Sequence, residues 1–501
     1  MFMFVIIKIR VLKKIIFTLL FPVISFGQIQ LGTDINGQSG DLSGYSVSVS
    51  DDGETIAISS VENSNSNGFQ SGCVRIYRFV SGVWTQIGAS INGAAEYDFS
   101  GTRIALSADG NIIAIGASHH DNGIYGNSGH VRVYQLIAGS WIQIGAEING
   151  IIGGIYSGSA VAVSDSGNIL AINSYSNTVN GNLSGQVKIF QNITGIWTQL
   201  GNDINGQAAV NMSGLGLSLS ADGMKVAIGA YGNDDNGEDS GNTRIYENIA
   251  GAWTQIGNDI DGESTGDYSG VRVSLSADGN TVAIGAIYND GNGTDSGHVR
   301  VYKNMSGNWI QLGTDIDGQN PGDESGIDIS LSANGTVLAI GSTGNSNSNG
   351  VKAGCVRVFQ FVSGVWTQIG ININGEAPED YSGGSISLSA DALKLAIGAI
   401  YNSGNGWYAG HVRVYGLSSI LTSDEFSNQK FSITPNPSST ILNISIQDNS
   451  ILEKVIIYNS VGQFIKTTTH EIVNVSDLAQ GTYFIELTTD KGKATKSFIK
   501  E

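Results

Sequence analysis

The sequence is poor in charge, in proline and above all in cysteine. Only 14% of its 501 residues are charged, five are Pro and two are Cys. Lys and Arg together number 25, against 44 Asp and Glu, which gives a formal net charge of −19. So few basic residues argue against a nucleic-acid partner, because phosphate binding needs Lys/Arg clusters. The acidity instead favours solubility in a salty exterior or the binding of cations.

Familiar catalytic signatures are also missing. The sequence contains no Gly-x-Ser-x-Gly, no zinc signature and no phosphate-binding loop. Glycine, in contrast, is abundant with 69 residues, and 41% of the chain is hydrophobic. This composition is typical of an all-β protein with many tight turns and a sizeable core, and it argues against a disordered chain.

Residues 1–27 have the features of an export signal. A basic region precedes an apolar run, residues 15–24, that is too short to span a bilayer. Residues 25–27 place small side chains at the −3 and −1 positions of a signal peptidase site, so we expect cleavage before Gln28. An uncleaved membrane anchor is the alternative. No other segment approaches transmembrane length, so we expect no transmembrane segment in the mature protein.

One unit recurs through most of the chain. Its clearest copy, residues 270–313, contains four strand-like runs separated by turn residues. Asp278-Gly279, between the first two runs, is a hairpin signal because Gly accepts positive φ. The Trp of the fourth run recurs every 56 or 57 residues, at Trp84, Trp141, Trp197, Trp253, Trp309 and Trp366. Four strands per unit at this period indicate a propeller or an array.

The units number seven, although one strand is displaced. The tight turn and the third run each occur seven times, whereas the Trp run occurs six times and is missing after Tyr415. At the other end of the chain, residues 29–32 match the fourth run. The N-terminal segment therefore supplies the outer strand of the last unit, which closes a ring without an unpaired strand. The predicted fold is all-β: a seven-bladed propeller with four strands per blade.

The strand patterns fit this prediction. Ser alternates with aliphatic residues in the first strand, as in residues 46–50, which suits the crowded centre of a ring. The second strand, as in residues 226–230, is apolar on both faces and should lie between neighbouring blades. We interpret each repeated Trp as a wedge between blades. The Arg or Lys of each third strand, such as Arg300, should bond a turn carboxylate or carbonyl.

Histidine and cysteine share one repeat position. His130, His298 and His411 occupy it in three blades and Cys73 and Cys355 in two others. A metal site shared around the ring is disfavoured, because consecutive ligands would come from different blades. The two Cys blades are not neighbours, so we expect no disulfide.

His119-His120-Asp121 interrupts the repeat in a long loop. This makes the segment the one local candidate for metal binding or acid–base chemistry, with a solvated loop as the alternative.

The long loops give the candidate binding face. Tight turns and the links between third and fourth strands lie on one face, so the loops between second and third strands and those between blades lie on the other. Loops on a rigid scaffold often carry recognition. Ligand or calcium binding is predicted for this face, around Asp234, Asp235, Asp239, Asp290 and Asp295. Solvated turns are the alternative.

The repeat unit resembles a known family. Asp-x-Ser-Gly at residues 267–270 and 380–383, followed by V-S-L-S-A-D-G, V-A-I-G-A and G-H-V-R-V-Y, looks like the FG-GAP class of propeller repeats. The resemblance covers residues 28–415 and implies an extracellular propeller concerned with recognition. Calcium-binding members of that class carry several Asp or Asn residues between the first two strands. This chain has one Asp and one Gly there, too few oxygens for calcium at that place.

The last part of the chain resembles a different family. Residues 416–430 form a polar, Ser-rich linker, and residues 431–501 contain Ile433-Thr434-Pro435-Asn436-Pro437 and a series of short strands. This segment is similar to the C-terminal sorting domain of the type IX secretion system, a small β-sandwich found in Bacteroidetes. The resemblance implies the secretion machinery as a partner, transport across the outer membrane, removal of the domain and attachment to the cell surface. A generic Ig-like adhesive module is the alternative.

Three function classes remain open. The blades are nearly alike, which favours a surface binding or adhesion propeller that recognises a glycan or protein ligand through its long-loop face. A secreted polysaccharide-active enzyme would need convergent carboxylates or basic residues on particular blades. A structural surface protein would need no concave site. No catalytic residue and no cofactor other than calcium is suggested by the sequence.

Overall fold

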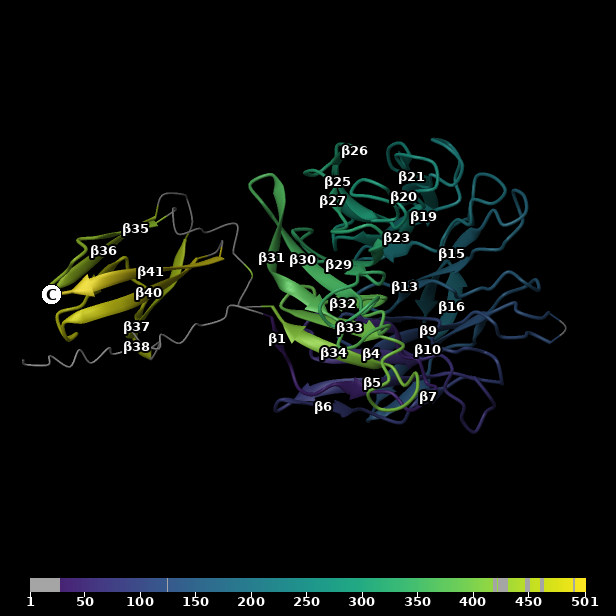
Figure 1. Ribbon diagram of the computed structural model, residues 1–501, viewed down its shortest axis with the longest axis horizontal. Coiled ribbons are helices and arrows are strands. Elements are labelled where there is room, and N and C mark those ends of the chain that lie inside the picture. Colours follow the sequence, from purple (N-terminus) through teal and green to yellow (C-terminus); the bar gives the residue numbers. More distant parts are fainter. Residues whose placement is uncertain are drawn as a thin grey trace, which may run out of the picture.

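The computed structural model describes residues 28–123, 125–417, 421, 431–446, 451–459, 464–489 and 492–501. The export signal expected in residues 1–27 and most of the linker expected in residues 416–430 lie outside these ranges. The regular elements within them are all β-strands (Figure 1). No helix in the described part of the chain is long and apolar enough to cross a membrane.

Residues 29–416 form seven antiparallel sheets, each with four main strands. The innermost strands are β3 (Ser43–Val49), β8 (Arg103–Leu106), β13 (Val161–Val163), β18 (Leu217–Leu219), β23 (Ser269–Leu275), β28 (Ser325–Leu331) and β32 (Ser385–Leu388). The second strands are β4 (Thr55–Ser60), β9 (Ile112–Ala117), β14 (Ile169–Ser174), β19 (Lys225–Ala230), β24 (Thr281–Ala286), β29 (Val337–Ser342) and β33 (Lys394–Ala399). We number the sheets as blades 1–7 in this order.

The third and outer strands complete each blade. The third strands are β5 (Cys73–Val80), β10 (His130–Ile137), β15 (Gln186–Ile193), β20 (Asn242–Ile249), β25 (His298–Met305), β30 (Cys355–Val362) and β34 (His411–Gly416). The outer strands are β6 (Val83–Gln86), β11 (Ser140–Gln143), β16 (Ile196–Gln199), β21 (Ala252–Gln255), β26 (Asn308–Gln311), β31 (Val365–Asn374) and β1 (Ile29–Gln30). Six short strands pair again with the third strands: β2 (Ile35–Asn36), β7 (Ile91–Asn92), β12 (Ile148–Asn149), β17 (Ile204–Asn205), β22 (Ile260–Asp261) and β27 (Ile316–Asp317).

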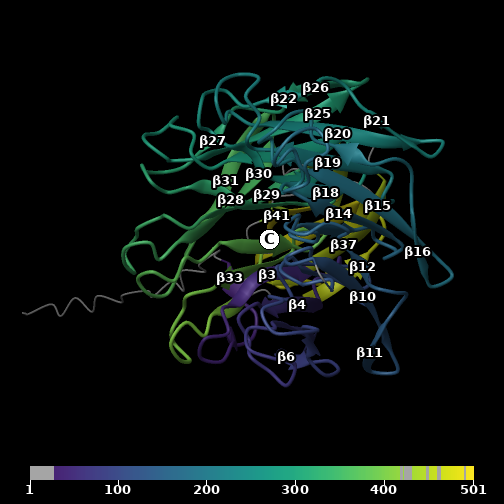
Figure 2. The ribbon, with the colours of Figure 1, turned by 90° about the vertical axis from the view of Figure 1, so that its right-hand side faces the viewer.

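Backbone hydrogen bonds close the seven sheets into a ring. One residue of each tight turn donates its N–H to the carbonyl of the same position in another blade, at 2.9 or 3.0 Å: Asp51 to Ala108, Ala108 to Asp165, Asp165 to Ala221, Ala221 to Ala277, Ala277 to Ala333, Ala333 to Ala390 and Ala390 to Asp51. The last bond returns to the first blade. Figure 2 shows β3 of blade 1 beside β33 of blade 7. The predicted all-β propeller is confirmed.

The N-terminal segment joins the last blade as predicted. β1 pairs antiparallel with β34, with Ile29 opposite Gly416 and Gln30 opposite Tyr415. β1 has no Trp, and Gln28 occupies the corresponding place: its Nε2 donates to the Ile371 carbonyl at 2.9 Å. Blade 7 is therefore assembled from both ends of the propeller segment.

The strand patterns have clear physical roles. Nearly every residue of the second strands is buried, as expected for strands covered on both faces. The small Ser side chains of the innermost strands do more than save space, because their Oγ atoms accept backbone N–H groups from a neighbouring blade at 2.9–3.1 Å. These serines are Ser48, Ser218, Ser274, Ser330 and Ser387.

Each repeated Trp bridges two blades. Its indole Nε1 donates to a backbone carbonyl of the preceding blade, as from Trp253 to Leu200 at 2.8 Å and from Trp309 to Ile256 at 2.9 Å. The interpretation as a wedge between blades is confirmed. Arg300, Arg357 and Arg413 donate to carbonyls of a neighbouring blade at 2.6–2.8 Å, as expected, whereas Arg244 donates to the hydroxyl groups of Tyr246 and Ser213.

The described residues of the segment 431–501 form two further sheets. One contains β35 (Phe431–Thr434), β36 (Ile441–Ile446) and β39 (Ile472–Asn474), and the other contains β37 (Leu452–Asn459), β38 (Phe464–Thr468), β40 (Gly481–Thr489) and β41 (Gly492–Lys500). Both sheets contribute side chains to one buried core, among them Phe431, Leu442, Val455, Ile485 and Phe498. The segment has its own core and the sheet pairing of a small sandwich.

Candidate functional site

The five aspartates predicted on the long-loop face do not converge on one point. The Oδ1 atoms of Asp234 and Asp290 accept the backbone N–H of Asp239 and Asp295, at 2.8 and 2.9 Å. Asp239 and Asp295 have φ of 52° and 54°, so these bonds hold tight, left-handed bends. Four of the predicted residues therefore shape two equivalent loops, in blades 4 and 5.

Asp235, the fifth, belongs to a carboxylate cluster. One oxygen from each of Asp235, Asp259 and Asp261 lies within 4.8 Å of the others. Burial, followed by the charges of Asp259 and Asp235, raises the pKa of Asp261. Gln255 donates to Asp259 Oδ1 at 2.6 Å, so part of this cluster is already bonded within the protein. The remaining oxygens can attract a cation, but the loops supply no preformed cage.

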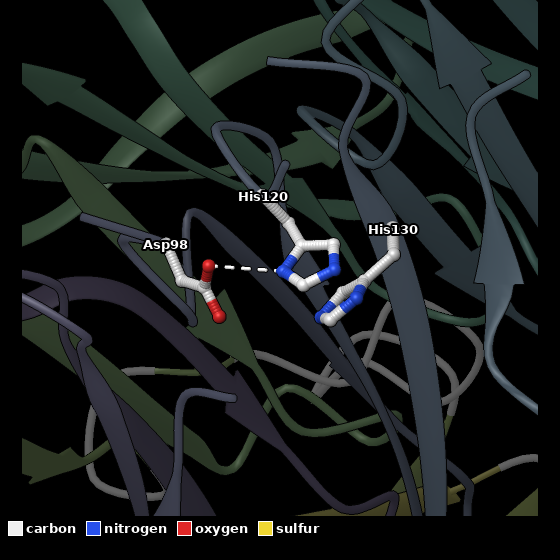
Figure 3. Close-up of side chains that lie close together, drawn as sticks. All are labelled: Asp98, His120 and His130. Carbon is white, nitrogen blue, oxygen red and sulfur yellow. Dashed lines mark hydrogen bonds and ion pairs between the residues drawn. The ribbon is translucent and has the colours of Figure 1, made fainter. Parts of the chain in front are cut away.

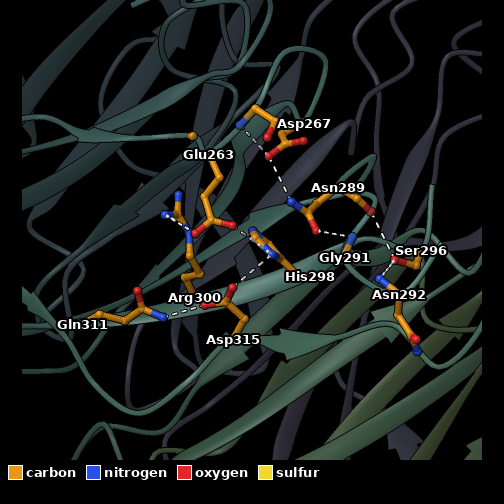
Figure 4. A network of polar contacts seen from close by, with 12 residues as sticks. Glu263, Asp267, Asn289, Gly291, Asn292, Ser296, His298, Arg300, Gln311 and Asp315 are labelled. Carbon is orange, nitrogen blue, oxygen red and sulfur yellow. Dashed lines mark hydrogen bonds and ion pairs between the residues drawn. The ribbon is translucent and has the colours of Figure 1, made fainter. Parts of the chain in front are cut away.

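A buried Asn–Asp pair supports the long loops in most blades. The Asp begins the Asp-x-Ser-Gly motif, and the Asn follows the second strand. In blade 5, Asn289 donates to Asp267 at 3.0 Å, and Asp267 also accepts the backbone N–H of Ser264 at 3.1 Å (Figure 4). In blade 6, Asn345 likewise donates to Asp323 at 3.1 Å. These carboxylates are structural in character, because backbone and amide donors already occupy them.

Carboxylates surround the buried histidines of blades 5 and 7. His298 Nδ1 lies 3.9 Å from Glu263 Oε2 and 3.9 Å from Asp315 Oδ2 (Figure 4). Burial, and then the charge of Arg300, lowers the pKa of His298 to about 4. His411 has an equivalent setting, with Asp34 and Glu376 at 3.6 and 3.8 Å. Sequence reasoning considered only a ring of His and Cys at this position and missed the carboxylates, which come from the flanking loops.

The segment His119-His120-Asp121 of blade 2 is divided among three roles. His119 is exposed and contacts aromatic rings, whereas Asp121 Oδ1 accepts the backbone N–H of Asn127 at 2.7 Å. His120 turns inward. Its Nδ1 lies 2.9 Å from Asp98 Oδ1, and its ring lies against that of His130, with centroids 3.9 Å apart and the ring planes inclined by 30° (Figure 3). His120 stands where other blades carry the Asn of the Asn–Asp pair.

The pKa values of the two neighbouring imidazoles shift in opposite directions. The hydrogen bond to Asp98 raises the pKa of His120 against the effect of burial. Burial, together with the charges of His120 and Arg132, lowers the pKa of His130 to about 3. Burial raises the pKa of Asp98, but the hydrogen bonds from His120 and the Ala95 N–H, with the charges of His120 and His130, together lower it. Near neutral pH, His130 is therefore a neutral base beside a carboxylate-bound imidazole.

Aromatic side chains gather where the innermost strands begin on the long-loop face. They form three groups with ring centroids 4.3–5.4 Å apart, which we call the aromatic arcs: Phe99, His119, Tyr156 and Tyr175; Tyr231, Tyr268 and Tyr288; Tyr381, Tyr401, Trp407 and Tyr408. The arcs span blades 2–3, 4–5 and 7. None of these residues is buried, and Trp407 is 70% exposed.

Sequence reasoning did not single out these rings. The signal that was available is their repeat position: Phe99, Tyr156, Tyr268 and Tyr381 all follow the first residue of the Asp-x-Ser-Gly motif or its equivalent. All four adopt φ between 49° and 56°, an uncommon conformation for aromatic residues. The motif therefore holds each ring at the start of an innermost strand.

Blade 3 has a pocket of about 250 Å³. Ile151 occupies the place of Glu263, Ile155 that of Asp267, and Lys188 that of Arg300. These residues line the pocket together with Gln186 and Phe190. The replacement of charged side chains by aliphatic ones makes this pocket more apolar than the equivalent regions of blades 5 and 7.

Comparison with known families agrees with this architecture. Residues 260–302 match the FG-GAP repeat, and the other blades repeat the sequence pattern of this segment. Residues 432–501 match the Secretion system C-terminal sorting domain. The chain thus combines a propeller that contains an FG-GAP repeat with a type IX sorting domain, which marks proteins exported to the cell surface or the extracellular space.

Solved structures with a related fold have low sequence identity. A proposed 6-phosphogluconolactonase from Bacteroides uniformis is 12% identical with a TM-score of 0.47, and the match covers 84% of this chain and 97% of that one. The periplasmic gluconolactonase of Pseudomonas aeruginosa is 15% identical with a TM-score of 0.46, covering 78% and 97%. The Dos1 propeller is 13% identical with a TM-score of 0.41, covering 78% and 96%. No curated protein matches the chain.

Proposed function

We propose that the long-loop face of the propeller binds an extracellular ligand, and that a glycan is the class that fits best. The aromatic arcs are the observation that carries this proposal. Tyr and Trp combine a flat apolar surface with a polar group, and they can cover the apolar face of a sugar ring while bonding its hydroxyl groups. The type IX sorting domain supports an extracellular place of action.

The loops around the arcs suit the same ligand. Asp234, Asp235, Asp239, Asp290 and Asp295 lie in the loops between second and third strands, on the same face as the arcs. Their free oxygens would accept bonds from hydroxyl groups, or hold calcium between the protein and a glycan. Exposed aromatic groups on a rigid ring are also typical of protein-binding surfaces, so a protein ligand is the competing outcome.

The test is a glycan-array and polysaccharide pull-down screen of the secreted protein, with and without calcium. Tyr156→Ala and Tyr268→Ala each remove one ring from an arc and should weaken binding about tenfold or more if both arcs contact the ligand. Ile196→Ala is the matched control, because this side chain is 66% exposed and lies at the turn into β16, on the opposite face. Equal binding by all three variants would contradict the proposal.

The role of the predicted aspartates needs a separate comparison. Alanine substitutions at the five loop aspartates should reduce binding, whereas Asp222→Ala and Asp278→Ala, on the tight-turn face, should not. Asp278 Oδ1 accepts the Ser276 hydroxyl and the Asn280 N–H, so the stability of these control variants must be measured too. If both sets have equal effects on binding, the loop aspartates are not part of the site.

A further inference from the structure

A second candidate site lies within blade 2, separate from the exposed arcs. Asp98 lies in the loop before β8, His120 follows β9, and His130 is the first residue of β10. We propose that these three residues bind a divalent transition metal ion, with zinc as the best fit. This proposal does not depend on the ligand of the aromatic arcs.

The donor atoms already converge. One ligand atom from each of Asp98, His120 and His130 lies within 4.8 Å of the other two. Figure 3 shows the Asp98 carboxylate directed at His120, and the His130 ring on the other side of that imidazole. Glu147 Oε2 lies 3.6 Å from His130 Nδ1 and offers a further oxygen at the edge of the cluster. Zinc sites commonly use three such protein ligands and keep a fourth position for water.

His130 provides an independent reason to expect a ligand. Its side chain is fully buried, and within the described part of the chain neither ring nitrogen has a hydrogen-bond partner. A buried polar group without a partner is costly, so such groups are rare in folded proteins. Other blades place Asn242 or Gln186 here, and Gln186 donates to Asn205 at 2.8 Å. A metal ion on a ring nitrogen of His130 would replace the missing bond.

The chemistry of the donors selects the class of metal. Two neutral imidazoles and one carboxylate favour zinc and related transition metals over calcium, which prefers six to eight oxygens. The clusters around His298 and His411 contain one imidazole each, and Arg300 and Arg413 lie beside their glutamates at 3.5 Å. In blade 2, Arg132 makes the equivalent bond to the Asn92 carbonyl at 2.8 Å, but Ala94 stands in the place of the glutamate and His120 supplies a second imidazole.

The repeats themselves provide substitutions that should fold. His120→Asn introduces the residue that pairs with the buried Asp in blades 1, 5, 6 and 7, and His130→Asn introduces the residue of blade 4. His298→Asn is the matched control, because it makes the same change at the same repeat position in blade 5. Circular dichroism and thermal unfolding should show that all three variants keep the fold.

The experiment uses the full chain without a purification tag. The protein is stripped with a chelator, dialysed against buffered zinc and analysed for metal per chain, and cobalt is added separately to follow its visible absorption. We expect one zinc ion per chain in the wild type and in His298→Asn. In His120→Asn and His130→Asn the affinity should fall by roughly 100-fold or more, because each loses one of the two imidazole ligands.

Three results would overturn the proposal. The first is that the wild-type protein binds no zinc, so that His120 and His130 form a pair of imidazoles without a metal ion. The second is equal loss of zinc in His298→Asn, which would place the metal elsewhere. The third is full retention of zinc in both blade 2 variants.

Discussion

The closure of the ring by β1 leads to a quantitative prediction. Removal of residues 28–32, so that the chain begins at Thr33, deletes β1 and its ladder with β34. Four further hydrogen bonds are lost: Leu31 N–H to Val414 O at 2.7 Å, Trp84 Nε1 to Leu31 O at 2.8 Å, Gln28 Nε2 to Ile371 O at 2.9 Å and Ile371 N–H to Gln28 Oε1 at 3.3 Å. Residues 414–416 of β34 then become an open edge, while β2 still pairs with His411 and Val412.

The magnitude follows from these contacts. At about 1 kcal/mol for each hydrogen bond, the four bonds alone contribute roughly 4 kcal/mol. The bonds of Gln28 are exposed and contribute less, whereas the half-buried indole N–H of Trp84 loses its acceptor. We therefore expect the free energy of unfolding to fall by about 3–5 kcal/mol, and the melting temperature by on the order of 5 °C, given the size of the propeller.

Urea unfolding and thermal melting, followed by near-ultraviolet circular dichroism, give both quantities. Ile29→Ala in the full-length chain is the control, because this side chain is 62% exposed and its loss should change stability by less than about 0.5 kcal/mol. If the chain beginning at Thr33 melts like the full chain, then the N-terminal strand does not stabilise the ring and the closure argument is wrong.

Three further predictions concern other parts of the chain. Trp253→Phe should destabilise the propeller by roughly 1–3 kcal/mol, because it leaves the Leu200 carbonyl without its donor, whereas Trp407→Phe, at an exposed position, should have no measurable effect in the same urea titration. The free energy of unfolding should fall as the pH drops from about 6.5 to 5, because unfolded histidine binds a proton there while buried His298 and His411, with pKa values of about 4, do not. The fall is at most about 1.4 kcal/mol per pH unit for each histidine, and the variant His298→Asn/His411→Asn should show a smaller slope. Intact-mass analysis of the protein from its native host should find a surface form that lacks most of residues 431–501; retention of the segment would contradict removal during export.

The ring was predictable because seven copies of one pattern report the same contacts. A single tight turn or a single Val-Arg-Val-Tyr run would not by itself indicate a propeller. The displaced outer strand at residues 29–32, likewise, can be recognised only by comparison with the other units. The same comparison assigned the repeated Trp correctly. Cys73 and Cys355 are buried free thiols in blades 1 and 6, as the predicted order of blades requires.

The candidate sites were harder to predict, because their residues meet across loops. Asp98 and His120 are 22 positions apart, and nothing in either local sequence indicates that they bond. The aspartates of the loops were selected by composition alone. In the structure, Asp234 and Asp290 use an oxygen to bond their own loop backbone, which composition cannot reveal. Comparison of repeat positions, rather than residue type, is the signal that could have separated the Asp98–His120 pair from the aspartates that only shape their loops.

Comparison of repeat positions singles out blades 2 and 3 for testing the proposed ligand site. Positions that are alike in most blades, such as the Asn–Asp pair and the repeated Trp, stabilise the ring. A different residue at such a position in one blade therefore suggests a role other than stability. Blade 2 replaces the Asn with His120, and blade 3 replaces the Asp of the pair with Ile155. The first aromatic arc, from Phe99 to Tyr175, spans the same two blades. Two departures from the common pattern therefore lie on neighbouring blades, beside this arc. A ligand bound there should therefore be more sensitive to substitutions in this arc than to those in the arc of blades 4 and 5.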